Sequence, residues 1–298
     1  MIKVCNVVKH FDTFKVLDEI SINVPKGAIY GLVGPNGAGK TTIINHITGA
    51  YRPEKGTIEI DGEKVYENPG IKEKVLSIAD DWFYYPSFTV KQMAEFYKSV
   101  YPAFNQERYN AIKEVFNIDE KRQIRKLSKG MKKQVAFWLS LSCMPNVLIL
   151  DEPLDGLDPV MRKQVLSLVI NDVIEREMTV LVSSHNLREL EDICDYVGII
   201  HKGRMILEKP LDDLKGNVHK YQVVFGETVP EDITQFDSVL HVSNTGSVYS
   251  IIMKGEVVQC DTLIRRYAPH VCERVSLTLE EVFIYELGGL GYDYKNIL

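Results

Sequence analysis

Hydrophobic and polar residues alternate in the first part of the chain, a spacing typical of half-buried β-strands. Strands are predicted over residues 2–8, 16–24, 28–33 and 57–60. The strand over 28–33 runs directly into a glycine-rich turn, and residues 41–48 then predict a helix that ends at Gly49. A buried strand followed by a glycine-rich turn and a helix indicates an α/β fold.

Between about residues 88 and 138, apolar residues recur at three- and four-residue spacing, which predicts helices. Beyond this stretch, short apolar strands alternate with helices. The predicted strands span residues 147–150, 179–182 and 196–200, and the predicted helices span 159–177 and 187–194. Because alternating strands and helices form mostly parallel sheets, residues 88–138 are interpreted as a helical insertion into an α/β core.

The pattern changes again after Gly216. Strands are predicted over residues 221–225, 239–242 and 247–253, and helices over 257–267 and 279–287. We therefore expect an α/β domain over residues 1–218 and a small α+β domain over residues 219–298.

Composition narrows the class of protein. Among 298 residues, 45% are hydrophobic and 26% are charged, which is typical of a folded chain, and the net charge of −6 argues against general nucleic-acid binding. The five cysteines form no CxxC pair, as expected for reduced thiols. No apolar run is long enough to span a bilayer. At a membrane, such a chain would be a peripheral protein on the cytoplasmic face, and it would be soluble when isolated.

Residues 34–41 carry the first candidate chemistry, because Gly-Pro-Asn-Gly-Ala-Gly-Lys-Thr fits the pattern G-x-x-x-x-G-K-[ST]. A loop with little side-chain bulk lets backbone N–H groups surround phosphates. Lys40 would contact the β and γ phosphates, and the Thr41 hydroxyl would bind Mg²⁺. The expected nucleotide-binding residues are Gly34, Pro35, Asn36, Gly37, Ala38, Gly39, Lys40, Thr41 and Thr42.

Two further predicted strands end in polar residues that suit hydrolysis. Asp151 and Glu152 follow the strand over 147–150, and His185 follows the strand over 179–182. The carboxyl ends of parallel strands share one edge of a sheet, so these side chains should lie near the phosphate loop. Asp151 would bind Mg²⁺, Glu152 would polarise the attacking water, and His185 would sense or orient the γ phosphate.

The sequence Leu-Ser-Lys-Gly-Met-Lys-Lys-Gln over 127–134 resembles the signature of ATP-binding cassette proteins, most commonly LSGGQ. The order of the other motifs is also similar, and 156–158 resembles the family's dimer-contact loop. The resemblance covers about residues 1–218. It implies a P-loop NTPase cassette that hydrolyses ATP as a head-to-tail homodimer or heterodimer, in which Ser128 and Gly130 face the ATP of the partner. It also implies that Phe11 stacks on adenine.

Three positions depart from the family pattern. Within the signature, Lys129 replaces the usual first glycine and Met131 replaces the usual glutamine. The family usually has a metal-contacting glutamine before the helical insertion, and alignment on residues 88–90 puts Asp80 at that position. Because a carboxylate can bind Mg²⁺, Asp80 is predicted to be a metal ligand together with Thr41 and Asp151.

These features predict an ATPase subunit. The chain resembles cassettes of the drug- and antibiotic-export type, and this resemblance implies that it powers an exporter whose membrane-spanning permease is a separate chain. Residues 82–88 are dense in aromatic side chains and would form a groove for a helix of that permease, although core packing accounts for part of them. One alternative is a cassette ATPase that acts on ribosomes or DNA, but the chain lacks a second cassette and a long coiled coil. Another is a regulatory module that binds nucleotide without hydrolysing it, which an ATPase assay would distinguish.

Overall fold

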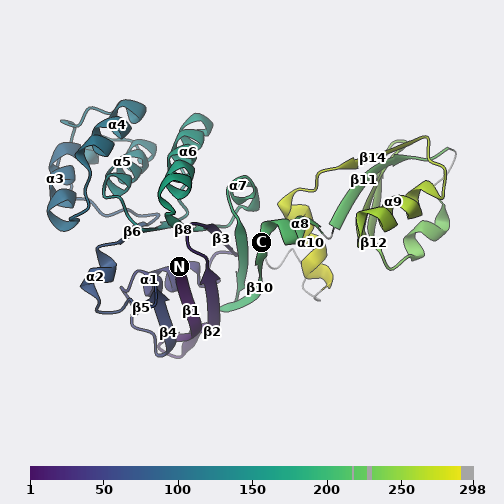
Figure 1. Ribbon diagram of the computed structural model, residues 1–298, viewed down its shortest axis with the longest axis horizontal. Coiled ribbons are helices and arrows are strands. Elements are labelled where there is room, and N and C mark those ends of the chain that lie inside the picture. The colour runs from purple at the N-terminus through teal and green to yellow at the C-terminus, as the bar shows by residue number, and fades with distance from the viewer. Residues whose placement is uncertain (217, 227–229, 290–298) are drawn as a thin grey trace. The chain divides into compact units, whose positions relative to one another are not determined.

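The computed structural model describes residues 1–216, 218–226 and 230–289 (Figure 1). Its contacts divide the chain into two compact units, Met1–Glu208 and Lys209–Leu298. The division therefore precedes the expected boundary after residue 218 by ten residues. The cause is helix α8 (Leu211–Gly216), which packs on strand β11 (Val218–Val224) and helix α10 (Leu279–Gly289) of the second unit.

The N-terminal strands of the first unit form an antiparallel sheet in the order β2-β1-β4-β5. Its strands are β1 (Ile2–Phe11), β2 (Phe14–Val24), β4 (Lys55–Ile60) and β5 (Glu63–Lys64). Ile2 pairs with Val24 on one side and with Ile60 on the other. The inward side chains of this sheet are buried against helix α1 (Lys40–Ile47), which positions the start of that helix.

The central sheet of the first unit has the order β10-β9-β3-β8-β7-β6. Its strands are β3 (Ile29–Val33), β6 (Val75–Ile78), β7 (Val147–Asp151), β8 (Thr179–Ser184), β9 (Tyr196–His201) and β10 (Arg204–Pro210). All pairs among β6, β7, β8, β3 and β9 are parallel, which confirms the predicted mostly parallel sheet. Strands β6 and β10 were not predicted. Helix α6 (Pro159–Arg176) connects β7 to β8, helix α7 (Leu187–Glu191) connects β8 to β9, and helix α2 (Pro69–Lys72) precedes β6.

The helical insertion is present, and its helices α3, α4 and α5 lie together in Figure 1. It consists of α3 (Val90–Val100), α4 (Gln106–Phe116), the 3₁₀ turn η1 (Ile124–Lys126) and α5 (Lys129–Ser142). Thr89 and Gln92 form a capping box that fixes the start of α3. Buried Trp138 stacks on Tyr109 and donates a hydrogen bond to its carbonyl oxygen at 2.7 Å, which joins α5 to α4.

In the described part of the second unit, the strands pair in the order β12-β13-β11-β14. The added elements are η2 (Glu231–Gln235), β12 (Val239–Thr245), β13 (Val248–Lys254), α9 (Val257–Arg265) and β14 (Val271–Val275). Tyr221, Ile251 and Ile264 belong to its buried core, so β11, β13 and α9 pack together. Across the described residues, no helix is both long enough and apolar enough to cross a membrane.

Candidate functional site

The phosphate loop connects β3 to α1. A Cβ atom at Gly34 would lie 2.3 Å from the carbonyl oxygen of Ile200 on β9, so only glycine allows the loop to lie this close to the sheet. Gly39 precedes α1 with a φ of 111°, a conformation that glycine adopts readily. The loop therefore directs its backbone and the first turn of α1 toward one point, where the helix N-terminus favours an anion.

Lys40 starts α1 and is buried, with 6% of its surface exposed. Its Nζ donates hydrogen bonds to the carbonyl oxygens of Gly34 at 2.7 Å and of Pro35 at 3.4 Å. The ammonium group is thus held inside the loop, at the position where phosphate oxygens would replace these carbonyl partners.

Asp151 lies at the end of β7, directly beside the phosphate loop. Thr41 Oγ1 donates a hydrogen bond of 2.8 Å to Asp151 Oδ2, and Ser183 Oγ donates to Asp151 Oδ1. Ser183 lies on β8 and is fully buried. It is a site residue that the sequence interpretation missed, although it directly precedes Ser184 and His185. Two hydroxyl donors therefore orient the Asp151 carboxylate.

Glu152 follows Asp151 with a φ of 47°, a left-handed conformation that turns its side chain out of the strand direction. Its Oε2 lies 2.9 Å from Nδ1 of His185, and its Oε1 lies 3.4 Å from Nζ of Lys40. The Oε1 atom is buried and accepts no hydrogen bond from the described protein atoms. Glu152 is therefore placed between the phosphate loop and the histidine, with a carboxylate oxygen facing each of them.

A cleft of about 440 Å³ opens over these groups. Its lining residues are Phe14, Val16, Pro35, Asn36, Gly37, Gly39, Lys40, Thr41, Thr42, Asp80, Asp151 and Glu152. It unites most of the predicted nucleotide and metal residues, including Asp80 from the segment after β6.

Phe14 lines the cleft and Phe11 does not, so the stacking of Phe11 on adenine stays a prediction. The Phe11 ring packs edge-on against Tyr51, with ring centroids 5.9 Å apart. Phe14 is 69% exposed at the start of β2 and was missed by the sequence interpretation. An exposed aromatic ring at the rim of a nucleotide cleft is suited to stack on a base.

The donor set fits a magnesium ion that is bound together with phosphate. Asp151, Thr41 and Asp80 supply only oxygen ligands to the cleft. No group of three or more His, Cys, Asp or Glu side chains suited to a metal ion occurs in the described part of the chain. A metal here would therefore need oxygens from the nucleotide, as Mg²⁺ does in phosphate-transfer sites.

Ser128 and Gly130 do not line this cleft. The Ser128 side chain caps α5 by accepting a hydrogen bond from the Met131 N–H at 3.2 Å. A Cβ atom at Gly130 would lie 2.7 Å from the carbonyl oxygen of Gly156, so the signature packs directly on the loop over 156–158. Lys129 extends its side chain along Gly156. The start of α5 and this loop thus form one surface, separate from the chain's own phosphate loop.

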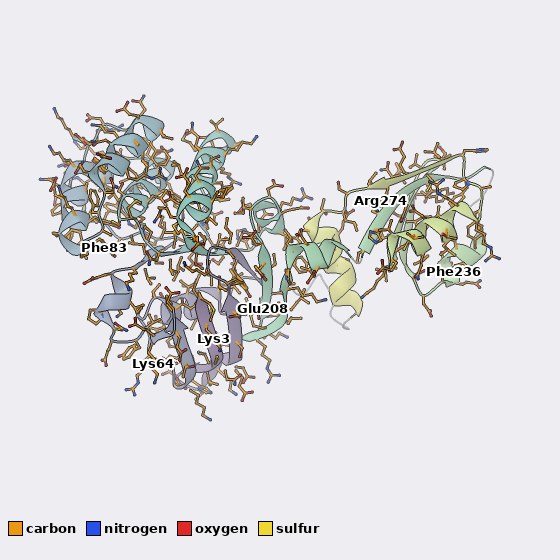
Figure 2. The ribbon with its side chains drawn as sticks, in the orientation of Figure 1. Lys3, Lys64, Phe83, Glu208, Phe236 and Arg274 are labelled. Carbon is orange, nitrogen blue, oxygen red and sulfur yellow. The ribbon has the colours of Figure 1, made fainter. Side chains whose placement is uncertain are left out.

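A groove of about 460 Å³ lies beside α3. Its walls include Phe83, Met93, Phe96 and Val100. Trp82 is buried and donates a hydrogen bond of 3.0 Å to the Tyr97 hydroxyl, which accounts for the core-packing part of the aromatic run. Phe83, labelled in Figure 2, is 68% exposed. Phe96 and Val100, which also line this groove, are 38% and 46% exposed, so the groove presents apolar side chains to solvent.

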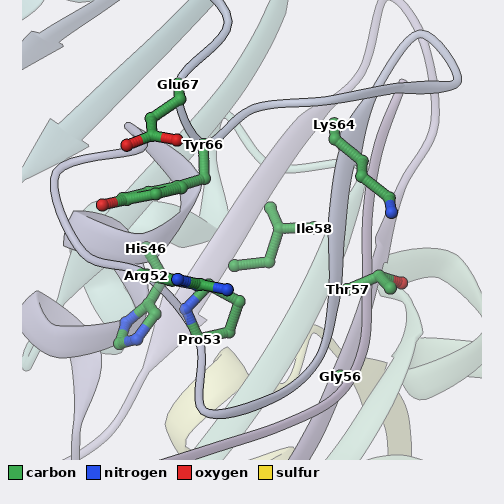
Figure 3. Close-up of a pocket in the computed structure, with 9 residues that line it drawn as sticks. All are labelled: His46, Arg52, Pro53, Gly56, Thr57, Ile58, Lys64, Tyr66 and Glu67. Atoms are coloured by element: carbon green, nitrogen blue, oxygen red, sulfur yellow. The ribbon is translucent and has the colours of Figure 1, made fainter.

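A different cavity of about 350 Å³ lies among α1, β4 and β5 (Figure 3). It contains His46, Arg52, Lys64, Tyr66 and Glu67, and none of these residues belongs to a nucleotide motif. Burial lowers the pKa of His46, whose Nδ1 lies 2.8 Å from the Thr42 carbonyl oxygen. The nucleotide chemistry therefore belongs to the cleft over Lys40 and Glu152.

Comparisons with known proteins agree with this geometry. A family profile described as "ABC transporter" matches residues 17–155. The chain is 32% identical to the ABC transporter ATP-binding protein YtrB of Bacillus subtilis (strain 168), over 97% of this chain and 99% of that protein. It is 37% identical to the bacitracin transport ATP-binding protein BcrA of Bacillus licheniformis, over 74% and 73%. A solved ATP-binding subunit of an ABC transporter has a TM-score of 0.68 at 26% identity, over 72% of this chain and 92% of that structure.

Proposed function

The chain belongs to the ABC transporter family of ATP-binding proteins, and we propose that it drives export through a separately encoded permease, as a head-to-tail dimer that hydrolyses Mg·ATP. It is an ATP-binding and ATP-hydrolysing transporter subunit.

The residues in the cleft divide the chemistry among them. Lys40 and the loop N–H groups bind the phosphates, and Thr41, Asp151 and Asp80 would hold Mg²⁺. A bound magnesium ion would neutralise charge that develops on the phosphate oxygens. Glu152 orients the attacking water and accepts its proton, and His185 fixes the Glu152 carboxylate through the contact at 2.9 Å. This assignment rests on the placement of Glu152 between Lys40 and His185.

We propose a dimer because the signature residues do not reach the chain's own nucleotide cleft. Ser128 and Gly130 are held at the start of α5 and against Gly156, outside the cleft. The N-terminus of a fourteen-residue helix is a binding site for phosphate when it is presented to a nucleotide. In a head-to-tail dimer, the α5 N-terminus of one copy would face the nucleotide in the other copy. ATP would then hold two cassettes together until it is hydrolysed.

The groove beside α3 is the observation that supports coupling to a membrane protein. Exposed Phe83, from the segment after β6, and exposed Phe96 and Val100 of α3 form an apolar surface. We assign this groove to a short helix of the permease, because aromatic side chains in a concave surface anchor such helices. The cassette would accordingly work at the cytoplasmic face of the membrane as a peripheral subunit.

Export is proposed over import because relatives of this chain are named for bacitracin and lantibiotic transport. The cargo itself would be selected by the permease, because the cassette's cleft is built for phosphate and contains no second set of cargo-binding groups among its lining residues.

The test is a pull-down of the tagged full chain from detergent-solubilised membranes of its own cell. The wild-type chain should recover a multi-spanning membrane protein in stoichiometric amount. Phe83→Ser should lose that protein and keep its affinity for ATP, because Phe83 does not line the nucleotide cleft. Ile174→Ser is the matched control, since Ile174 is 74% exposed on α6 and is not among the residues that line the groove.

Retention of the membrane protein by Phe83→Ser would overturn the assignment of the groove. Recovery of ribosomal or DNA-associated proteins in place of a membrane protein would overturn the coupling to transport and leave the ATPase chemistry in place.

A further inference from the structure

The carboxylate of Asp80, which lines the nucleotide cleft, also forms an ion pair with a lysine outside the cleft. Lys133 Nζ lies 3.3 Å from Asp80 Oδ1 and donates a hydrogen bond to it. Lys133 is only 3% exposed, whereas the Asp80 side chain is 52% exposed toward the cleft. The contact spans 53 residues of sequence and joins the segment after β6 to the helix that begins at the signature.

A buried ammonium group needs a compensating partner, because its transfer from water is costly. Among the described residues, Asp80 is the acid with which Lys133 forms an ion pair. Asp80 therefore has two roles to fill: it neutralises Lys133, and it faces the site of the nucleotide-bound metal beside Asp151 and Thr41.

A second contact ties the same two segments together. Lys132 Nζ lies over the ring of Tyr84, 5.1 Å from its centroid. Adjacent lysines of α5 thus hold Asp80 and Tyr84, at the two ends of one short segment. Residue Trp82 lies between them and is anchored to Tyr97 of α3. Movement of Asp80 toward the cleft would be transmitted to α5, whose N-terminus carries the signature.

We propose that Lys133 is a positioning residue that holds Asp80 in the absence of metal. Mg²⁺ and Lys133 then compete for one carboxylate, and metal binding is transmitted to α5, the helix that begins at the signature. This inference rests on the proposed nucleotide and metal function of the cleft. It explains how an acid can occupy this position: the buried lysine balances its charge when the metal is absent.

The pairing is tested first without nucleotide or metal, by thermal unfolding of the full chain followed by tryptophan fluorescence. Both tryptophans, Trp82 and Trp138, lie in the first unit, so the signal reports that unit alone. Asp80→Asn should lower the Tm by roughly 2–8 °C, because it leaves Lys133 buried without a counter-charge. Adding Lys133→Met should restore most of the loss, because the double variant contains no buried charge at this point.

The competition is tested by titrating Mg²⁺ against binding of a fluorescent ATP analogue, in a Glu152→Gln background that prevents turnover. Lys133→Met should lower the half-saturating Mg²⁺ concentration roughly threefold to tenfold, because Asp80 is released to the metal. Asp80→Asn should raise it. In the Asp80→Asn background, Lys133→Met should have no further effect. Lys163→Met is the matched control, because Lys163 is exposed on α6 and does not line the cleft.

An Asp80→Asn variant that unfolds at the wild-type temperature would overturn the pairing. A change in Mg²⁺ dependence on Lys133→Met that is the same with and without Asp80 would overturn the competition. If the wild-type chain shows no Mg²⁺-dependent nucleotide binding, the proposed function fails and the competition fails with it, whereas the unfolding comparison independently decides whether Lys133 pairs with Asp80.

Discussion

Nδ1 of His185 lies 2.9 Å from Oε2 of Glu152. The other carboxylate oxygen, Oε1, lies 3.4 Å from Nζ of Lys40. One glutamate thus contacts both the phosphate-loop lysine and the histidine at the end of the neighbouring strand β8. The His185 side chain is 51% exposed, so this contact is formed at the open side of the site.

Glu152→Gln should abolish steady-state ATP hydrolysis, with a loss of roughly 10²–10⁴-fold, because an amide cannot accept the proton of the attacking water. ATP binding should persist, since glutamine retains the size of glutamate and the phosphate loop is unchanged. The measurement is phosphate release under saturating ATP, together with gel filtration in ATP to detect a trapped dimer. Normal turnover would show that Glu152 is not the general base.

Lys40→Met should weaken ATP binding roughly tenfold to a hundredfold, because charged hydrogen bonds to the phosphates are lost. The affinity is measured by titration with a fluorescent ATP analogue. Lys163→Met provides the control, because Lys163 is exposed on α6 and lies outside the cleft. Unchanged affinity in Lys40→Met would remove the loop over 34–41 from the nucleotide site.

Gly130→Ala should destabilise the first unit by about 1–3 kcal/mol, because its Cβ would lie 2.7 Å from the Gly156 carbonyl oxygen and the backbone must shift. We expect a lower Tm and a lower ATPase rate. Gly70→Ala is the comparison, since the nearest atom to its added Cβ, Asn68 Oδ1, lies at 3.6 Å, so no loss of stability should follow. Equal behaviour of the two variants would contradict the close contact between signature and loop.

The hydrogen bonds of Glu54 should make the stability of the folded chain depend on pH. Its Oε1 accepts a hydrogen bond from the His10 backbone N–H and its Oε2 lies 2.7 Å from His10 Nδ1; these bonds lower the pKa of Glu54 from 4.5 to about 2. A carboxylate with a depressed folded-state pKa stabilises the fold above its unfolded-state pKa and loses that contribution as the pH falls. The contribution of Glu54 should therefore be complete above about pH 4.5 and decline toward pH 2.

The measurement compares unfolding midpoints of wild-type and Glu54→Gln chains from pH 7 to pH 3. Their difference should be constant at neutral pH and shrink below pH 4.5, because the variant has no carboxyl group to protonate at this position. A difference that does not change with pH would show that the hydrogen bonds to His10 do not depend on the charge of Glu54.

Much of the site was predictable because its residues are adjacent in the chain. The order of a buried strand, a glycine-rich turn and Lys40-Thr41 predicted the phosphate loop, and the strand that ends in Asp151-Glu152 predicted the acids. The cleft unites them, because β3 and β7 both flank β8 in the same parallel sheet. Local sequence determines such features, because residues that are adjacent in a loop or at a strand end stay adjacent in the folded structure.

Tertiary structure alone decided which distant side chains meet. The sequence predicted Asp80 as a metal ligand, but its partner Lys133 lies 53 positions away, and the place of Lys133 in the signature does not indicate this contact. The sequence also pointed to Phe11, whereas the strand pairing between β1 and β2 presents Phe14 to the cleft. The packing of Gly130 on Gly156 likewise depends on how α5 meets the loop before α6. Periodicity along the chain fixes which residues are buried, but the pairing of buried and charged groups depends on how the elements pack in three dimensions.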